Sequence, residues 1–164
     1  NHPGSEAAQA ANGSAQLYRD FRGHRDFDRF TPAEVDFIGA RDSFYMATVS
    51  ETGWPYVQHR GGPPGFVHVL DDRTLACPDF RGNRFFNTLG NLLGDPRAGL
   101  LFVDFASGDV LQLAGRAEII LDSPLINLFE GAERLWTFDV EQVVLRPAGA
   151  HAAACAHNGY RLTA

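Results

Sequence analysis

The chain has 164 residues, of which 45% are hydrophobic and 21% are charged, and its formal net charge at pH 7 is -6. This composition predicts a single globular domain with a substantial core, and the acidic balance with scattered arginines argues against a nucleic-acid binder. No apolar run approaches the roughly 18 residues that a membrane-spanning helix needs.

The cysteines indicate a cellular compartment, and the composition along the chain indicates how the sequence is divided. Cys77 and Cys155 are far apart and fit no metal-binding spacing, and two thiols without a disulfide framework favour a cytoplasmic protein. The sequence divides into an N-terminal lead over residues 1–30, a globular domain over 31–146 and a C-terminal tail over 147–164.

The first clear element is a helix that begins after Thr31. In Thr31-Pro32-Ala33-Glu34 the threonine can cap the helix, the proline suits its first position, and the glutamate completes a capping box. β-Branched and aromatic residues then predict a strand over 43–50, a turn at Gly53, and a returning strand over 54–60.

Alternation along the returning strand separates its side chains into two sets. Tyr56, Gln58 and Arg60 fall on one face, whereas Val57 and His59 fall on the other. The next strands are predicted over 66–70 and 74–78, and short connections favour an antiparallel meander of all four.

The second half of the sequence predicts further strands and two short helices. The expected elements are a helix over 84–93, strands over 98–105 and 110–121, a short helix after Ser123, and a last strand over 136–146. Gly115 is expected to mark a bulge or bend in the long strand. Mainly antiparallel strands without alternating helices predict a closed or half-closed β-barrel with flanking helices.

Cationic side chains beside glycines make residues 58–84 the best candidate for a binding site. Arg60, Arg81 and Arg84 could clamp a phosphate, because guanidinium groups pair with phosphate oxygens and glycines let backbone N–H groups approach. The alternative is that these arginines are surface residues with rim ion pairs. For the clamp, Arg60 and Arg84 are expected to lie near the surface.

Other side chains in this stretch could meet a flat heterocycle. Gln58 offers both a donor and an acceptor, His59 is the only candidate for proton transfer, and Phe80 could stack on a ring. The histidines show no established zinc spacing, although His151-x3-Cys155-x-His157 could in principle bind zinc or haem iron. No serine lies in a glycine-flanked nucleophile turn.

The order of these motifs resembles a known family. GWPYVQHRGG, DFRGNR, a helix, GDPRAGLLFVDF and VLQLAGRAEII follow one another as in the pyridoxamine 5′-phosphate oxidase-related FMN-binding split-barrel proteins. The resemblance covers roughly residues 37–121. It implies a six-stranded antiparallel split barrel that forms a homodimer, with FMN in a groove between the subunits.

The resemblance also implies roles for particular residues. Arg60 would hold the FMN phosphate together with a second group formed by Arg81, Asn83 and Arg84. The flavin ring would be flanked by residues of the second strand and by a glutamine of the long strand; these are Val57, Gln58, His59 and Gln112.

The C-terminal part differs from the oxidase itself. The segment after Arg146 lacks the Trp and Arg context that holds pyridoxal phosphate in that enzyme. The prediction is therefore an FMN-dependent oxidoreductase acting on another small molecule. The alternatives are a non-catalytic flavin-binding or sensing module, or the same fold binding a deazaflavin or haem.

Overall fold

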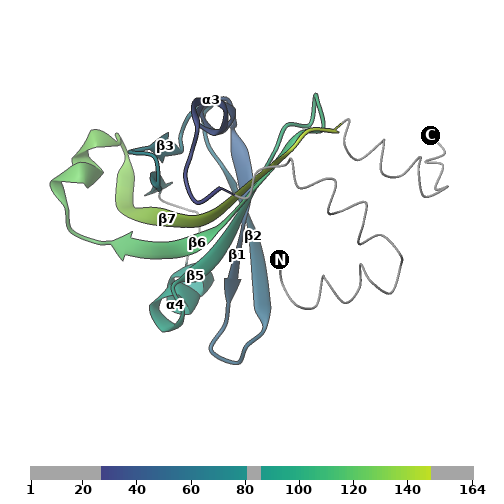
Figure 1. The fold of residues 1–164 in the computed structure, drawn as a ribbon. Helices are drawn as coiled ribbons and strands as arrows, with labels where there is room; N and C mark the ends of the chain where they lie inside the picture. The colour runs from purple at the N-terminus through teal and green to yellow at the C-terminus, as the bar shows by residue number, and fades with distance from the viewer. Residues whose placement is uncertain (1–26, 81–85, 149–164) are drawn as a thin grey trace, which may run out of the picture.

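The computed structural model describes residues 27–80 and 86–148. Its elements in chain order are α3 (Pro32–Gly39), β1 (Ser43–Val49), β2 (Pro55–Gly61), β3 (His68–Val69), β4 (Thr74–Phe80), α4 (Phe86–Gly94), β5 (Arg97–Val103), β6 (Val110–Ile120), the 3-10 helix η2 (Pro124–Leu128) and β7 (Ala132–Arg146). The strands form one antiparallel sheet in the order β2-β1-β5-β6-β7-β4-β3. Helix α3 lies above the strands and helix α4 below them in Figure 1.

The capping box predicted for the first helix is confirmed. The backbone N–H of Thr31 donates to the carboxylate of Glu34 at 2.7 Å, and the Thr31 hydroxyl donates to the same oxygen. Glu34 is fully buried, so these bonds place a carboxylate in the interior at the positive end of the helix dipole. The N-terminus of helix α3 is thereby capped.

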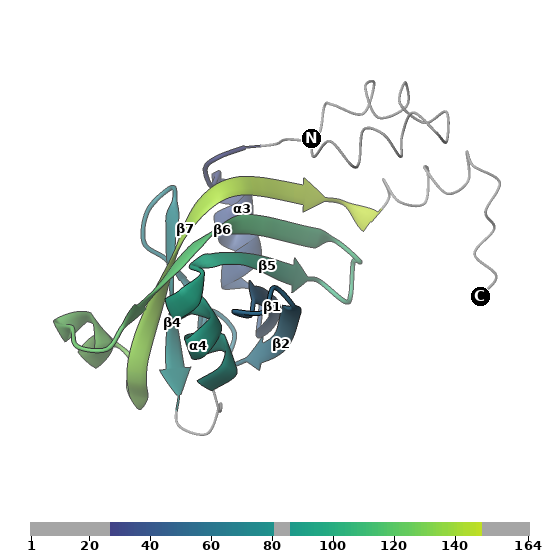
Figure 2. The same ribbon diagram turned by 90° about the horizontal axis from the view of Figure 1, so that it is seen from below.

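The long strand β6 has the irregularity that Gly115 predicted. Its pairing with β7 shifts register between Ala114 and Gly115. A Cβ atom at Gly115 would lie 2.1 Å from the carbonyl oxygen of Asp139, so only glycine permits this close approach of the two strands. Strands β5, β6 and β7 run side by side through the curved middle of the sheet (Figure 2).

The prediction of a four-stranded meander is wrong. β1 pairs with β2 and β3 pairs with β4, but β2 and β3 lie at opposite ends of the strand order. In the corner between them, the backbone N–H groups of Gly62 and Gly65 donate to the carbonyl oxygens of Asp42 and Arg41, at 2.9 and 3.1 Å. The corner is thus bonded to the segment before β1, which carries the chain across the barrel instead of back along β2.

The sheet coils until its two ends face each other. Arg60 lies on β2 and Asp79 on β4, and four strands, β1, β5, β6 and β7, separate them in the sheet order. Their side chains nevertheless form an ion pair of 3.0 Å. This contact confirms the expected mainly β, antiparallel split barrel. The described sheet has seven strands rather than six because the two-residue β3 adds a short edge to β4.

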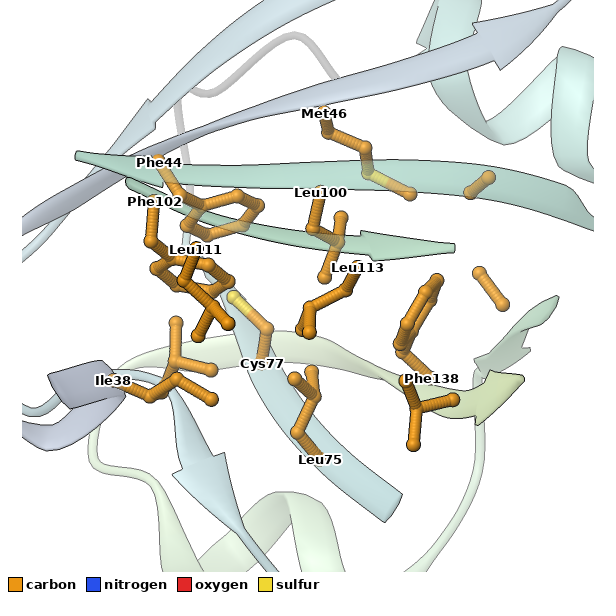
Figure 3. Packing of buried hydrophobic residues seen from close by; sticks show 14 of the residues in the cluster. Ile38, Phe44, Met46, Leu75, Cys77, Leu100, Phe102, Leu111, Leu113 and Phe138 are labelled. Atoms are coloured by element: carbon orange, nitrogen blue, oxygen red, sulfur yellow. The ribbon is translucent and has the colours of Figure 1, made fainter. Parts of the chain in front are cut away.

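Aromatic and aliphatic side chains fill the barrel. Phe44, Phe102 and Phe138 are buried, and the rings of Phe44 and Phe102 stack with centroids 5.1 Å apart (Figure 3). Burial of each such side chain contributes about 1.5–3 kcal/mol. Cys77 on β4 joins this cluster as a buried thiol. None of the helices among the described residues is long and apolar enough to cross a membrane.

Candidate functional site

The alternation predicted for β2 is confirmed, and it divides the candidate site residues between two faces. Gln58 is half-buried and Arg60 is buried on the inner face, whereas Val57 and His59 are exposed on the outer face. Arg60 retains only 3% of its accessible surface. The expectation that Arg60 lies near the surface is therefore wrong, because it pairs with the core residue Phe44 on the side of β2 that faces the barrel interior.

Arg60 belongs to a buried ionic cluster that joins β2, β4 and β7. Its Nη1 donates to Asp79 Oδ1 at 3.0 Å, and Arg134 Nε on β7 lies 3.1 Å from Asp79 Oδ2. The side chains of Arg60 and Asp79 are each 3% exposed, and that of Arg134 is 20% exposed. Two guanidinium groups thus share one buried carboxylate across the split of the barrel.

The charge balance of this cluster favours a further anion. Burial lowers the pKa of the Arg60 guanidinium below its usual value, and the neighbouring Asp79 carboxylate opposes that shift only in part. Among the described residues, Glu133 also lies near the cluster, 3.6 Å from Arg134, with a side chain that is 44% exposed, so solvent weakens its contribution. The cluster is therefore suited to hold a phosphate oxygen next to its two cations.

Helix α4 completes the cluster from the other side. The hydroxyl of Thr88 donates to Gln58 Oε1 at 2.8 Å, and Arg60 Nη2 donates to the same oxygen at 3.3 Å. One turn further on, Asn91 Nδ2 donates to Thr48 Oγ1 on β1 at 3.0 Å. A continuous chain of polar contacts therefore links Arg134, Asp79, Arg60, Gln58 and Thr88; we call these five residues the split network.

The split network lies beside the segment that carries the other predicted phosphate ligands. Asp79 is the penultimate residue of β4, Phe80 ends that strand half-buried, and Thr88 lies in the first turn of α4. Arg81, Asn83 and Arg84 fall in the stretch that joins β4 to α4, outside the described residues. The His151-x3-Cys155-x-His157 motif is likewise outside them.

Gln112 shares the outer face with His59, at a distance from the split network. Direct pairing runs from His59 to Tyr45, from Tyr45 to Leu101, and from Leu101 to Gln112. Three strand spacings of about 4.8 Å separate the first residue from the last, or roughly 14 Å. His59 contacts the Tyr45 ring edge-on, with centroids 5.4 Å apart. The structure thus brings Gln58 and Arg60 together and places Val57, His59 and Gln112 on the opposite face.

Three members of the split network, Asp79, Thr88 and Arg134, were not predicted from the sequence. Asp79 left a signal, since an acidic residue at the end of the apolar run Leu75-Ala76-Cys77-Pro78 needs a buried partner. Thr88 left none, because α4 reaches β2 only when the barrel closes. Arg134 left none, because its place opposite Asp79 depends on the pairing of β7 with β4, two strands that are far apart in the sequence.

The donor set of the split network fits a flavin phosphate cofactor. FMN presents acceptor oxygens on its phosphate and on its ring carbonyls, and the network offers guanidinium groups and a carboxamide. Among the described residues, no three His, Cys, Asp or Glu side chains gather in a way that would hold a metal ion.

Comparison with known proteins identifies the family. A family model described as pyridoxamine 5′-phosphate oxidase matches residues 30–148. No curated protein matches the chain.

Solved structures share the fold at low sequence identity. A putative pyridoxamine 5′-phosphate oxidase from Lactobacillus delbrueckii is 19% identical, with a TM-score of 0.61 over 73% of this chain and 97% of that chain. An FMN-binding protein from Syntrophomonas wolfei is 11% identical, with a TM-score of 0.52 over 68% of this chain and 84% of the other. HutZ, a heme storage protein from Vibrio cholerae, is 16% identical, with a TM-score of 0.50 over 73% of this chain and 94% of the other.

These three likenesses concern the fold, whereas the family model covers most of the sequence itself. The chain belongs to the pyridoxamine 5′-phosphate oxidase-like split-barrel family.

Proposed function

We propose that the protein is an FMN-binding flavoprotein that performs redox chemistry on a small molecule. The observation that carries this proposal is the split network, in which Gln58 and Arg60 of β2 and Arg134 of β7 present nitrogen donors within a barrel of this family. When bound, FMN supplies the electron- or hydride-transfer chemistry. The chain's own residues bind the cofactor, orient it and set the charge around it.

In this proposal the phosphate is held by the cations near the split. Arg60 and Arg134 share Asp79, which fixes both guanidinium groups in place before the ligand arrives. Arg81, Asn83 and Arg84 are proposed to contribute from the β4–α4 connection, as the family resemblance implies. Phe80, at the end of β4, is proposed to lie against the cofactor.

Residues of the outer face are proposed to act in a homodimer. Val57, Ala47, Gly99 and Ala114 lie in register across β2, β1, β5 and β6, which leaves a smooth face of small and apolar side chains. Val57 is 62% exposed, which is unusual for an apolar residue in a strand centre. A second copy of the chain would cover this face. Val57, His59 and Gln112 would then belong to the cofactor groove between the subunits.

Only one of these outer-face residues is a candidate for proton transfer. The imidazole of His59 is exposed and is held against Tyr45, so a bound substrate could reach it. We propose His59 as the residue to test for an acid–base role.

An absorption spectrum tests the proposed cofactor. Full-length protein is reconstituted separately with FMN, a deazaflavin and haem, desalted, and scanned between 300 and 600 nm. The proposal expects retention of FMN near one equivalent per chain and a dimer by light scattering. Retention of haem with its Soret band, or of the deazaflavin, in place of FMN would contradict the proposal. Retained FMN without turnover by NAD(P)H or oxygen and a panel of acceptors would indicate a sensing module instead of an enzyme.

A further inference from the structure

The carboxamide oxygen of Gln58 accepts two hydrogen bonds from within the protein. Thr88 Oγ1 donates to it at 2.8 Å and Arg60 Nη2 donates to it at 3.3 Å. A carbonyl oxygen has two lone pairs, so these two bonds use its capacity as an acceptor. The amide nitrogen of the same side chain is left to face other partners.

Arg60 decides which end of the carboxamide points inward. A hydroxyl can donate or accept, so Thr88 alone would permit either orientation. A guanidinium group has only donors, so the atom of Gln58 that faces Arg60 must be the oxygen. Arg60 cannot turn away easily, because Asp79 holds its other terminal nitrogen at 3.0 Å within the barrel.

Thr88 strengthens this orientation. Its side chain is 1% exposed, so a flipped carboxamide would leave two N–H donors against Arg60 in a site that water does not reach freely. The donors of Gln58 are therefore fixed on the side away from Thr88 and Arg60, and the side chain is half-buried rather than closed off.

We propose that Gln58 is a donor-only specificity residue of the cofactor site and that Thr88 is its positioning residue. Gln58 then contacts an acceptor oxygen of the ligand, either a ring carbonyl or a phosphate oxygen, and not the N–H edge of the ring. This inference rests on the proposed function. The sequence predicted that Gln58 could both donate to and accept from a bound ring, whereas the proposed orientation leaves it only donation.

Stability measurements on the ligand-free, full-length protein test the orientation. Gln58→Glu keeps an oxygen against Thr88 and Arg60, so its urea midpoint should equal or exceed that of the wild type. The control Gln58→Met has a similar length but only a weakly accepting sulfur, so its midpoint should fall. If Gln58→Glu loses as much stability as Gln58→Met, the proposed orientation is overturned.

Binding of FMN and of riboflavin, measured by quenching of flavin fluorescence, tests the contact. Loss of one hydrogen bond weakens binding about 2- to 10-fold. In Gln58→Glu a carboxylate oxygen would also face the acceptor, so the Kd for FMN should rise by more than about tenfold. Weaker binding of both ligands would assign the contact to a ring carbonyl, and weaker binding of FMN alone would assign it to the phosphate. Unchanged or tighter FMN binding by Gln58→Glu would overturn the proposal.

A double-mutant cycle tests the role of Thr88. Thr88→Val should weaken FMN binding in the wild-type background but not in the Gln58→Met background. Thr88→Ser, which keeps the hydroxyl group, should bind FMN as the wild type does. An equal effect of Thr88→Val in both backgrounds would refute the positioning role. A wild-type protein that binds neither flavin would refute the proposed function and with it the flavin contact, while the order of urea midpoints would still decide the orientation.

Discussion

Removing the charge of Asp79 is expected to destabilise the barrel strongly. Asp79→Asn preserves the shape of the side chain but leaves Arg60 and Arg134 with no shared carboxylate. Both ion pairs are short, at 3.0 and 3.1 Å, and the side chains of Arg60 and Asp79 are each 3% exposed. Breaking a buried pair by removing one partner costs about 3–5 kcal/mol. The free energy of unfolding should fall by that amount.

Urea unfolding at pH 7, followed by circular dichroism, measures this loss. The matched control is Glu141→Gln, which breaks the surface ion pair with Arg116, whose side chains are 56% and 59% exposed. Exposed pairs contribute about 0–1 kcal/mol, so the control should stay within that range. An Asp79→Asn variant as stable as Glu141→Gln would show that the split network does not hold the barrel together.

Three further predictions concern the glycines, the buried thiol and a partly exposed carboxylate. In urea unfolding, Gly115→Ala should destabilise the protein by about 2–3 kcal/mol, because its Cβ would lie 2.1 Å from a carbonyl oxygen of β7. Gly90→Ala on α4 should instead stabilise the protein by about 0.5–1 kcal/mol, because a Cβ there meets nothing within 4 Å. Burial raises the pKa of the Cys77 thiol, so in a Cys155→Ser variant, which keeps Cys77 as its one thiol, DTNB at pH 8 should not react until the protein is unfolded. A fast reaction of the folded variant would contradict this burial. Hydrogen bonds from the side chain and backbone of Arg97 lower the pKa of Asp95 to about 2. The stabilisation they give is present above the ordinary carboxyl pKa and is lost as the pH falls through about 2; in Arg97→Ala, an NMR titration should show the Asp95 pKa rising toward its ordinary value.

Local patterns in the sequence were sufficient to predict most elements. The capping residues around Thr31 and Glu34 predict α3, and alternation along residues 54–60 predicts which side chains of β2 face inward. Gly115 predicts the bulge of β6. Each of these features depends on interactions between residues close in the chain or on the geometry of one strand.

The path of the chain between β2 and β3 could not be predicted in this way. A short connection favours a hairpin, but Gly62 and Gly65 donate their hydrogen bonds to the segment before β1. Those acceptors are about twenty residues earlier in the chain, and nothing in the sequence of the corner identifies them. The meander was therefore the wrong expectation for a reason that lies in tertiary structure.

The candidate site was predicted in part. Gln58 and Arg60 were selected from their place beside glycines, and the structure brings them into one network. Their partners Asp79 and Thr88 come from β4 and α4, which reach β2 only when the barrel closes. Arg134 joins them because β7 pairs with β4 and places it opposite Asp79. Arg60 is buried for the same reason, so a test that removes its side chain would disturb folding as well as binding.

A crystal structure of the full-length protein grown with FMN is the most direct test of the central claim. We expect the flavin to lie at the split network, with an acceptor oxygen about 3 Å from Gln58 Nε2 and with Gln58 Oε1 still bonded to Thr88 and Arg60. FMN bound away from Gln58, or absent at saturating concentration, would contradict the assignment of the split network as the cofactor site.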